Sequence, residues 1–207
     1  MPKNIYPGKF IVIEGLDGSG QSTQVKLLSE FLIKNGHNVV STKEPTKDSE
    51  AGKNIRDVIN KSCEVSPSKL QELFAEDRRE HLANVIVPAL KDGKTVISDR
   101  YFFSSFAYGA ASGADLEDLI GLNQDFLMPD FTVILRVKPE VCMERIGKRG
   151  ESQTLFEQRE KLAKVWKIYE ILPQRFDGVY IIDGERTIEK VQENIKELLQ
   201  ENLWTGR

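Results

Sequence analysis

A glycine-rich turn between an apolar segment and the start of a helix constrains this chain more than any other feature. Residues 10–14 read Phe-Ile-Val-Ile-Glu, and residues 15–23 read Gly-Leu-Asp-Gly-Ser-Gly-Gln-Ser-Thr. Gly15, Gly18 and Gly20 have no Cβ atom, so the backbone can turn tightly and point several N–H groups inward at an anion. The following helix adds the positive end of its dipole. The segment therefore predicts a phosphate-binding loop.

The loop matches the P-loop pattern G-x-x-x-x-G-K-[ST] at every position but one. Gln21 stands where the pattern has a lysine that reaches the terminal phosphates of a nucleotide, and glutamine supplies no positive charge. Ser22 stands where a hydroxyl binds Mg²⁺. A connection that binds nothing is the alternative, but three glycines within 15–20 are costly to order unless something uses them. The predicted nucleotide-binding residues are Gly15, Leu16, Asp17, Gly18, Ser19, Gly20, Gln21, Ser22 and Thr23.

The size and composition of the chain favour one soluble globular domain over residues 1–207. Hydrophobic residues make up 40% and charged residues 29%, and no apolar run approaches the length of a membrane span or signal peptide. A net charge of −3 argues against a nucleic-acid-binding surface. Cys63 and Cys142 show no metal or redox spacing, so we expect reduced thiols and a cytoplasmic location.

Short apolar segments alternate with longer helical patterns, which predicts an α/β fold around a parallel sheet covered on both faces. The predicted strands are 10–14, 38–42, 95–98, 131–137 and 179–182. The predicted helices are 22–35, 52–60, 68–91, 115–126, 139–146, 154–175 and 187–202. Ligands gather at the carboxyl ends of such strands. We expect one cleft there, formed by the glycine loop, Glu44-Pro45, Asp99-Arg100 and Asp183-Gly184.

Asp99 and Arg100 end the third predicted strand and suit the chemistry of phosphoryl transfer. A carboxylate at this place can hold Mg²⁺ directly or through water. A guanidinium binds a phosphate through two parallel hydrogen bonds, which lysine cannot copy. The alternative is a salt bridge between neighbours at the strand end, and the nearby glycine loop disfavours it.

Phe74 and Arg78 share one face of a predicted helix, where a ring and a guanidinium can stack on and hydrogen-bond a nucleobase. Their spacing alone favours the alternative, in which Phe74 is plain core and residues 76–80 form a solvated charged face. His81 is isolated in the sequence and is interpreted as a structural or surface residue.

Arg145, Lys148 and Arg149 form a basic cluster flanked by glycines. Such a cluster suits a mobile lid that brings positive charge over bound phosphates, and an ordinary basic loop is the alternative. The glutamine at position 21 favours the lid, because charge missing from the loop must come from elsewhere.

Several linked motifs occur in order along the chain. They are Glu14-Gly15-Leu16-Asp17-Gly18, Glu44-Pro45, Leu73-Phe74-Ala75-Glu76-Asp77-Arg78, and Asp99-Arg100-Tyr101 followed by Ser104-Ser105 and Ala107-Tyr108. From Lys9 to Val191 the chain resembles the thymidylate kinases, members of the nucleoside-monophosphate kinase family. The resemblance implies a three-layer P-loop kinase fold with a five-stranded parallel sheet and a small lid at about 145–156. It also implies transfer of the γ-phosphoryl group of ATP to dTMP, giving dTDP and ADP, with Mg²⁺.

The resemblance implies roles for single residues around the acceptor base and sugar. Phe74 would stack on thymine, Arg78 would hydrogen-bond a carbonyl of the base, and Ser105 would approach the base edge. Tyr108 would crowd the 2′ position of the sugar and disfavour ribose.

Other implied roles concern the phosphates and adenine. Arg56 and Arg100 would clamp the acceptor phosphate, and Asp17 would lie near the sugar 3′-hydroxyl and the phosphates. Arg145 would lie against adenine, and Arg149 resembles the lid arginine of family members. The implied catalytic residues are Arg100, Arg149, Asp99 and Gln21, and the implied metal ligands are Ser22 and Asp99. Homodimers are usual in the family, and Ala83–Leu90 offers an apolar face for one.

The chain departs from the family pattern at several places. Gln21 replaces the loop lysine, Lys43 stands where many members have arginine, and Thr46-Lys47 replaces a glycine pair. Gly109 stands where some bacterial members have a base-contacting glutamine. Two alternatives therefore stay open: a kinase for another deoxynucleoside monophosphate such as dUMP, or a nucleotide-binding protein with little kinase activity. Gln21 as an introduced substitution in an ordinary enzyme is a third.

Overall fold

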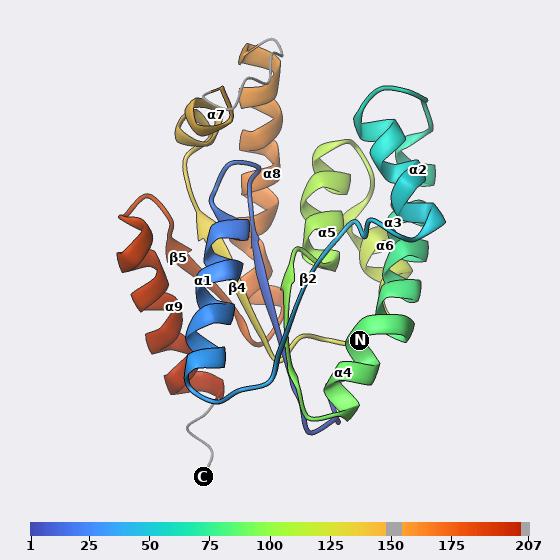
Figure 1. Ribbon diagram of the computed structural model, residues 1–207. Coiled ribbons are helices and arrows are strands. Elements are labelled where there is room, and N and C mark those ends of the chain that lie inside the picture. The colour runs from blue at the N-terminus through green and yellow to red at the C-terminus, as the bar shows by residue number, and fades with distance from the viewer. Residues whose placement is uncertain (148–154, 204–207) are drawn as a thin grey trace.

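A five-stranded parallel sheet forms the centre of the protein, with the strand order β2-β3-β1-β4-β5 (Figure 1). The computed structural model describes residues 1–147 and 155–203, the side chains of 155–158 apart. The strands are β1 (Lys9–Gly15), β2 (Val39–Lys43), β3 (Thr95–Asp99), β4 (Phe131–Arg136) and β5 (Val179–Asp183). The predicted parallel sheet is confirmed, because every predicted strand is present within two residues of its expected ends.

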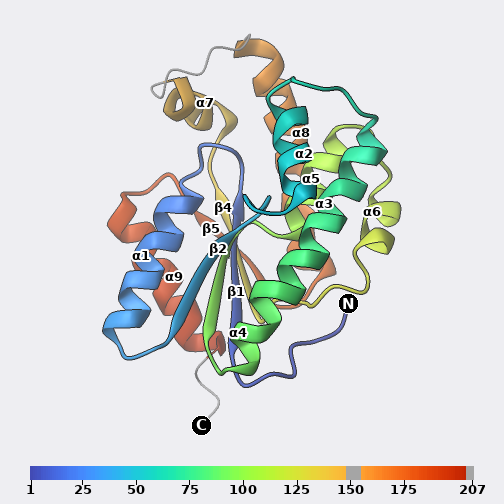
Figure 2. The same ribbon diagram turned by 45° about the vertical axis from the view of Figure 1, so that its right-hand side comes forward.

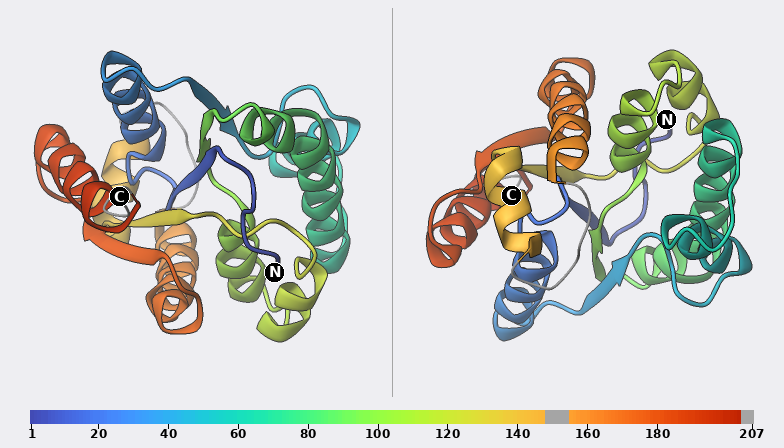
Figure 3. Two further views of the ribbon diagram at one scale, coloured as in Figure 1. Left: turned by 90° about the horizontal axis from the view of Figure 1, so that it is seen from below. Right: turned by 90° about the horizontal axis from the view of Figure 1, so that it is seen from above.

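Helices cover both faces of the sheet (Figure 3). One face carries α1 (Gln21–Lys34) and α9 (Ile188–Leu203), and the other carries α4 (Val87–Lys91), α5 (Phe102–Ala111) and α8 (Leu155–Arg175). The central strand shows why, because its side chains alternate between two hydrophobic cores. Phe10 and Val12 belong to the core under α5 and α8, whereas Ile11 and Ile13 belong to the core under α1 and α9.

The long helix predicted over 68–91 consists of α3 (Pro67–His81), a π-helical turn η1 (Leu82–Ile86) and α4. Ser66 starts it, because its side chain accepts a hydrogen bond from the N–H of Lys69 at 3.1 Å. The π turn comes just before Pro88, which has no N–H to donate to the preceding turn and needs room for its ring.

The sequence analysis missed α5, and the predicted helix over 115–126 is shorter than expected. α5 is apolar on nearly every side, so its sequence shows no amphipathic period. The shorter helix is α6 (Leu116–Leu122). Asp115 caps its N-terminus, because the Asp115 carboxylate accepts hydrogen bonds from the N–H groups of residues 117 and 118. The remaining helices are α2 (Glu50–Ile59) and α7 (Pro139–Gly147). Within 1–147 and 155–203, no helix is long and apolar enough to cross a membrane.

Candidate active site

The glycine loop joins the carboxyl end of β1 to the start of α1 and lies beside α7 (Figure 2). All three loop glycines have positive φ: 151° at Gly15, 84° at Gly18 and 100° at Gly20. A Cβ atom on Gly18 would lie 2.6 Å from the carbonyl oxygen of Cys142. Nothing lies within 4 Å of such an atom on Gly20, so this glycine is required by its backbone conformation alone. Leu16 packs into the core.

Gln21 bends back onto the loop. Its side-chain Nε2 donates to the carbonyl oxygen of Gly15 at 2.5 Å, and the residue is only 6% exposed. The amide therefore holds the shape of the loop, in a place where the P-loop pattern has a charged group directed at phosphates.

Ser22 and Asp99 meet at the start of α1, as the metal prediction requires. The Ser22 hydroxyl donates to Oδ2 of Asp99. Oδ1 of the same carboxylate is buried and has no hydrogen-bond partner in the described part of the chain. A hydroxyl next to a carboxylate with an unused oxygen is a donor set that suits Mg²⁺.

Lys43 reaches the same carboxylate, and the sequence analysis did not identify it as a site residue. Its Nζ lies 2.8 Å from Oδ2 of Asp99 and 3.5 Å from Oγ of Ser22. Lys43 ends β2 and stands directly opposite Asp99 in the register of β2 and β3. The pairing of these two strands is the signal that would have found it.

Arg100 connects the glycine loop to α5. Its backbone has φ 76°, which is uncommon for a residue with a Cβ atom and costs about 1–3 kcal/mol. The guanidinium donates to the Gly15 carbonyl at 3.1 Å, to Oγ of Ser104 at 2.9 Å and to Oδ1 of Asp17 at 2.7 Å. It also lies 5.3 Å from the centre of the Tyr108 ring, whose hydroxyl accepts from the Asp17 N–H. The structure thus brings together three predicted residues: Asp17, Arg100 and Tyr108.

Glu14 fixes the turn that carries Arg100, and it was not predicted as a site residue. Its buried carboxylate accepts from the N–H of Tyr101 at 2.8 Å, the N–H and hydroxyl of Ser104 at 3.1 and 2.6 Å, and the hydroxyl of Tyr169 at 2.9 Å. Burial raises the pKa of this carboxyl above its ordinary value of 4.5, against the lowering effect of Arg100 and of these hydrogen bonds.

Arg78 lies inside the protein, so the interpretation of 76–80 as a solvated face is wrong at this residue. It is 1% exposed. Its Nε and Nη2 donate to one carboxylate oxygen of Glu44 at 2.9 and 2.6 Å, and Nη1 donates to Asn123 at 2.6 Å. Ser105, which we expected near the base edge, has its hydroxyl 3.4 Å from Nη2. His81 is also buried, with its Nδ1 3.1 Å from the other carboxylate oxygen of Glu44, so it is a structural residue and not a surface residue.

The other predicted arginines lie at separate edges of the site. Arg56 donates to the backbone carbonyls of Thr46 and Lys47, which are not among the partners of Arg100. Arg145 spans the loop and the turn after β5, with Nη1 3.3 Å from the Ser19 carbonyl and Nη2 3.5 Å from the Gly184 carbonyl. Phe74 on α3 is half-buried. Arg149 and most of the predicted lid lie outside the described residues.

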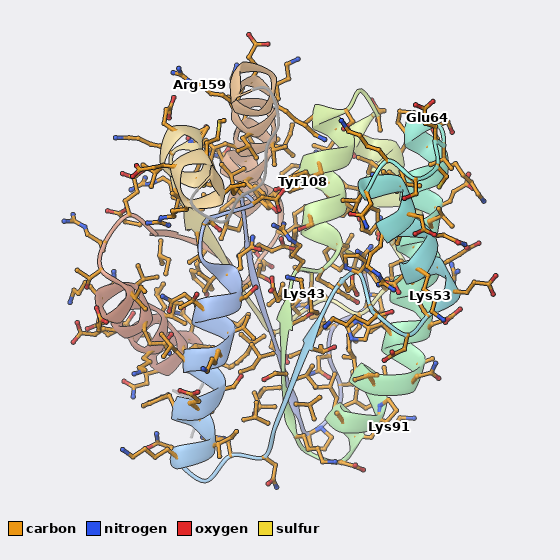
Figure 4. All side chains as sticks on the ribbon, turned by 45° about the horizontal axis from the view of Figure 1, so that its top comes forward. Lys43, Lys53, Glu64, Lys91, Tyr108 and Arg159 are labelled. Atoms are coloured by element: carbon orange, nitrogen blue, oxygen red, sulfur yellow. The ribbon has the colours of Figure 1, made fainter. Side chains whose placement is uncertain are left out.

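A cavity of about 650 Å³ opens where these elements meet, a size that suits a small ligand. Lys43 and Tyr108, both labelled in Figure 4, belong to its wall. The other residues of the wall are Asp17, Gly18, Gly20, Gln21, Ser22, Thr23, Val58, Ile59, Lys61, Leu70, Arg100, Ile146, Lys161 and Leu162.

The parallel sheet, the glycine loop at the end of β1 and the Ser22–Asp99 pair define a P-loop nucleotide-binding protein. The family model for thymidylate kinases matches residues 13–195. The chain therefore belongs to the thymidylate kinase family, as the motifs predicted.

Curated relatives agree with this assignment. The chain is 40% identical to the probable thymidylate kinase of Thermococcus gammatolerans, with 96% of this chain and 99% of the relative covered. It is 41% identical to the probable thymidylate kinase of Pyrococcus horikoshii, over 95% and 98% of the two chains. A thymidylate kinase of Desulfotalea psychrophila is 38% identical, over 91% and 93%.

The raised pKa of Glu14 predicts a pH-dependent contribution to stability. Between pH 4.5 and the raised pKa, the folded protein keeps a proton on this carboxyl that the unfolded chain releases. The free energy of unfolding of the wild type should therefore fall, relative to Glu14→Gln, as the pH rises from 4.5 through the raised pKa. Urea unfolding of both proteins across this pH range measures the difference. A difference that grows in favour of the wild type with rising pH would contradict the prediction.

Proposed function

We propose that this chain transfers the γ-phosphoryl group of ATP to dTMP, giving dTDP and ADP. The observation that carries the proposal is the Arg100 guanidinium, which contacts Gly15 and Asp17 of the glycine loop and the ring of Tyr108 on α5. One cation thus contacts both the loop proposed for the donor nucleotide and Tyr108, which is proposed for the acceptor sugar. The names of the relatives support dTMP as that acceptor.

On the acceptor side, we assign Phe74, Arg78, Ser105 and Tyr108 to the base and sugar, and Arg56 and Arg100 to the phosphate. The contact between Arg78 and Ser105 supports this, because it draws α3 and α5 together beside the cavity. An oxygen of the acceptor phosphate attacks the γ-phosphorus while the bond to the ADP oxygen breaks. Arg100 neutralises charge on the acceptor and holds it in line.

On the donor side, the backbone N–H groups of residues 15–23 surround the phosphates. Arg145 supports a place for adenine, because it already bridges the loop and the turn after β5. Arg149 is proposed, from the family resemblance, to close over the transferring group. Ser22 and Asp99 are the residues that would hold Mg²⁺, which when bound neutralises charge on the β- and γ-phosphate oxygens.

A panel of acceptors tests the proposed function. ADP production from ATP and Mg²⁺ should depend on dTMP and should be slower with dUMP, dCMP, dGMP and UMP at equal concentration. UMP should fail because Tyr108, as the family resemblance implies, would crowd a 2′-hydroxyl. Faster turnover with dUMP than with dTMP would make dUMP the acceptor. Binding of ATP without ADP production on any acceptor would favour a nucleotide-binding protein with little kinase activity.

We further propose that Lys43 supplies the positive charge that Gln21 does not. Both line the cavity, and the Lys43 ammonium lies beside Ser22 at the first turn of α1. Its side chain is 54% exposed, and its ammonium pairs with Asp99 at 2.8 Å, so it reaches a phosphate by exchanging this partner. Because Lys43 ends β2, its backbone position is fixed by the sheet.

A cycle of two substitutions tests this role of Lys43. Lys43→Met should lower kcat by about 10²–10³-fold, the usual loss when one placed charge contact is removed. The same substitution in a Gln21→Lys background should cost much less, because the loop then carries its own charge. Lys94→Met, at the opposite end of the sheet, is the matched control and should leave kcat unchanged. Equal losses in both backgrounds would contradict the compensation.

We also propose a homodimer. The apolar face predicted over 83–90 divides into a buried and an exposed part. The buried residues, which pack into the core of their own chain, are Ile86, Ala89 and Leu90. The exposed apolar residues are Ala83, Val85 and Pro88. Light scattering should give twice the mass of one chain, and Val85→Asp should shift it to that of a monomer because the charge would be buried in the interface. A monomeric wild type at micromolar concentration would contradict this proposal.

A cytoplasmic location completes the proposal. Cys63 is exposed and Cys142 is buried, and both are free thiols. Free thiols are typical of proteins in a reducing compartment.

A further inference from the structure

A buried amide on α3 has no partner for its oxygen. Gln71 is 7% exposed, and its Oε1 is buried without a hydrogen-bond donor in the part of the chain that the structure describes. A buried acceptor left unpaired costs about 1–3 kcal/mol, so such a group points to a missing donor.

Gln71 lies on the face of α3 that also carries Phe74 and Arg78, which follow it by three and seven residues. The side chain presses against Gly109 of α5, because a Cβ atom added to that glycine would lie 3.1 Å from Cδ of Gln71. Ser105, one turn earlier on α5, lies beside Arg78. Two helices therefore face each other with Gln71 at one end of the contact and Arg78 at the other.

Both helices of this contact reach the cavity wall. Leu70 and Tyr108, the sequence neighbours of Gln71 and Gly109, line the cavity wall. Gly109 leaves the room that the Gln71 amide occupies, since any larger residue would meet both this amide and Leu119. The absence of a side chain at position 109 is thus matched by a long polar side chain at position 71.

We infer that Gln71 reads the base of the acceptor nucleotide, an assignment that rests on the proposed function. Thymine and uracil carry an N3–H donor beside a keto oxygen, whereas N3 of cytosine has no proton. The unpaired Oε1 of Gln71 accepts from N3–H, and Nε2 of the same amide is a donor for the keto oxygen. Gln71 is therefore a specificity-determining residue for pyrimidines with a keto group at position 4.

Gln71→Leu tests the inference, because leucine keeps most of the volume and removes the unpaired oxygen. The variant should unfold at the same temperature as the wild type or higher, since no buried acceptor remains unpaired. It should bind dTMP about 10- to 100-fold more weakly, the loss expected for a removed buried hydrogen bond, with ATP affinity unchanged. Calorimetric titration with dTMP and with ATP measures both affinities.

A modified ligand separates a direct contact from a change of shape. N3-methyl-dTMP lacks the N3–H donor, so methylation should weaken binding to the wild type far more than binding to Gln71→Leu. A purely structural role of Gln71 would weaken both ligands equally.

Gln192→Leu is the matched control. Gln192 on α9 is 4% exposed, and its amide atoms also lack partners among the described residues. It lies on the opposite face of the sheet from α5, so its replacement should leave dTMP affinity within about twofold of the wild type.

The outcomes distinguish the inference from the proposed function. Equal dTMP affinity in the wild type and Gln71→Leu, or an equal effect of N3-methylation in both, would overturn the role of Gln71 and leave the kinase proposal intact. A wild type that binds ATP but no dTMP would overturn the proposed function and this inference with it. A loss of dTMP affinity at unchanged or higher stability supports both.

Discussion

The site depends on one buried carboxylate at the end of the central strand. Glu14 lies near the end of β1, just before the glycine loop. Its carboxylate accepts hydrogen bonds from the Tyr101 N–H and from the N–H and hydroxyl of Ser104 at the start of α5. It thereby fixes the turn in which Arg100 adopts its left-handed backbone. The same side chain shares Ser104 with Arg100. Loop and guanidinium are therefore positioned by one group whose burial is compensated by these bonds, by the Tyr169 hydroxyl and by the charge of Arg100.

The distribution of charge around the loop differs from that of the P-loop pattern. Gln21 closes the loop onto the Gly15 carbonyl and contributes geometry without charge. Two cations beside the loop belong to neighbouring elements, Lys43 at the end of β2 and Arg100 after β3. These side chains reach the loop because parallel strands bring their carboxyl ends to one edge of the sheet. The fold thus brings charges that are distant in sequence to the loop.

Much of the fold and part of the site followed from sequence patterns. The five strands were predictable because buried parallel strands are short apolar runs bounded by turns, and the glycine loop because few other residues allow its φ angles. α5 was not predictable by period, since a helix buried on most sides has no polar face. The charged run over 76–80 favoured a solvated face for Arg78, whose buried partners lie 34 and 45 residues away.

The sequence by itself determined the class of the protein, because the loop glycines, Ser22 and the Asp99-Arg100 pair are local patterns whose chemistry depends on residue type and spacing. Only the tertiary structure decided which side chains meet. Lys43 finds Asp99 through the register of β2 and β3, and Gln71 fills the space left by Gly109 through the packing of α3 on α5. Both contacts join residues far apart in the chain, and side-chain packing across elements leaves no periodic signal in either segment.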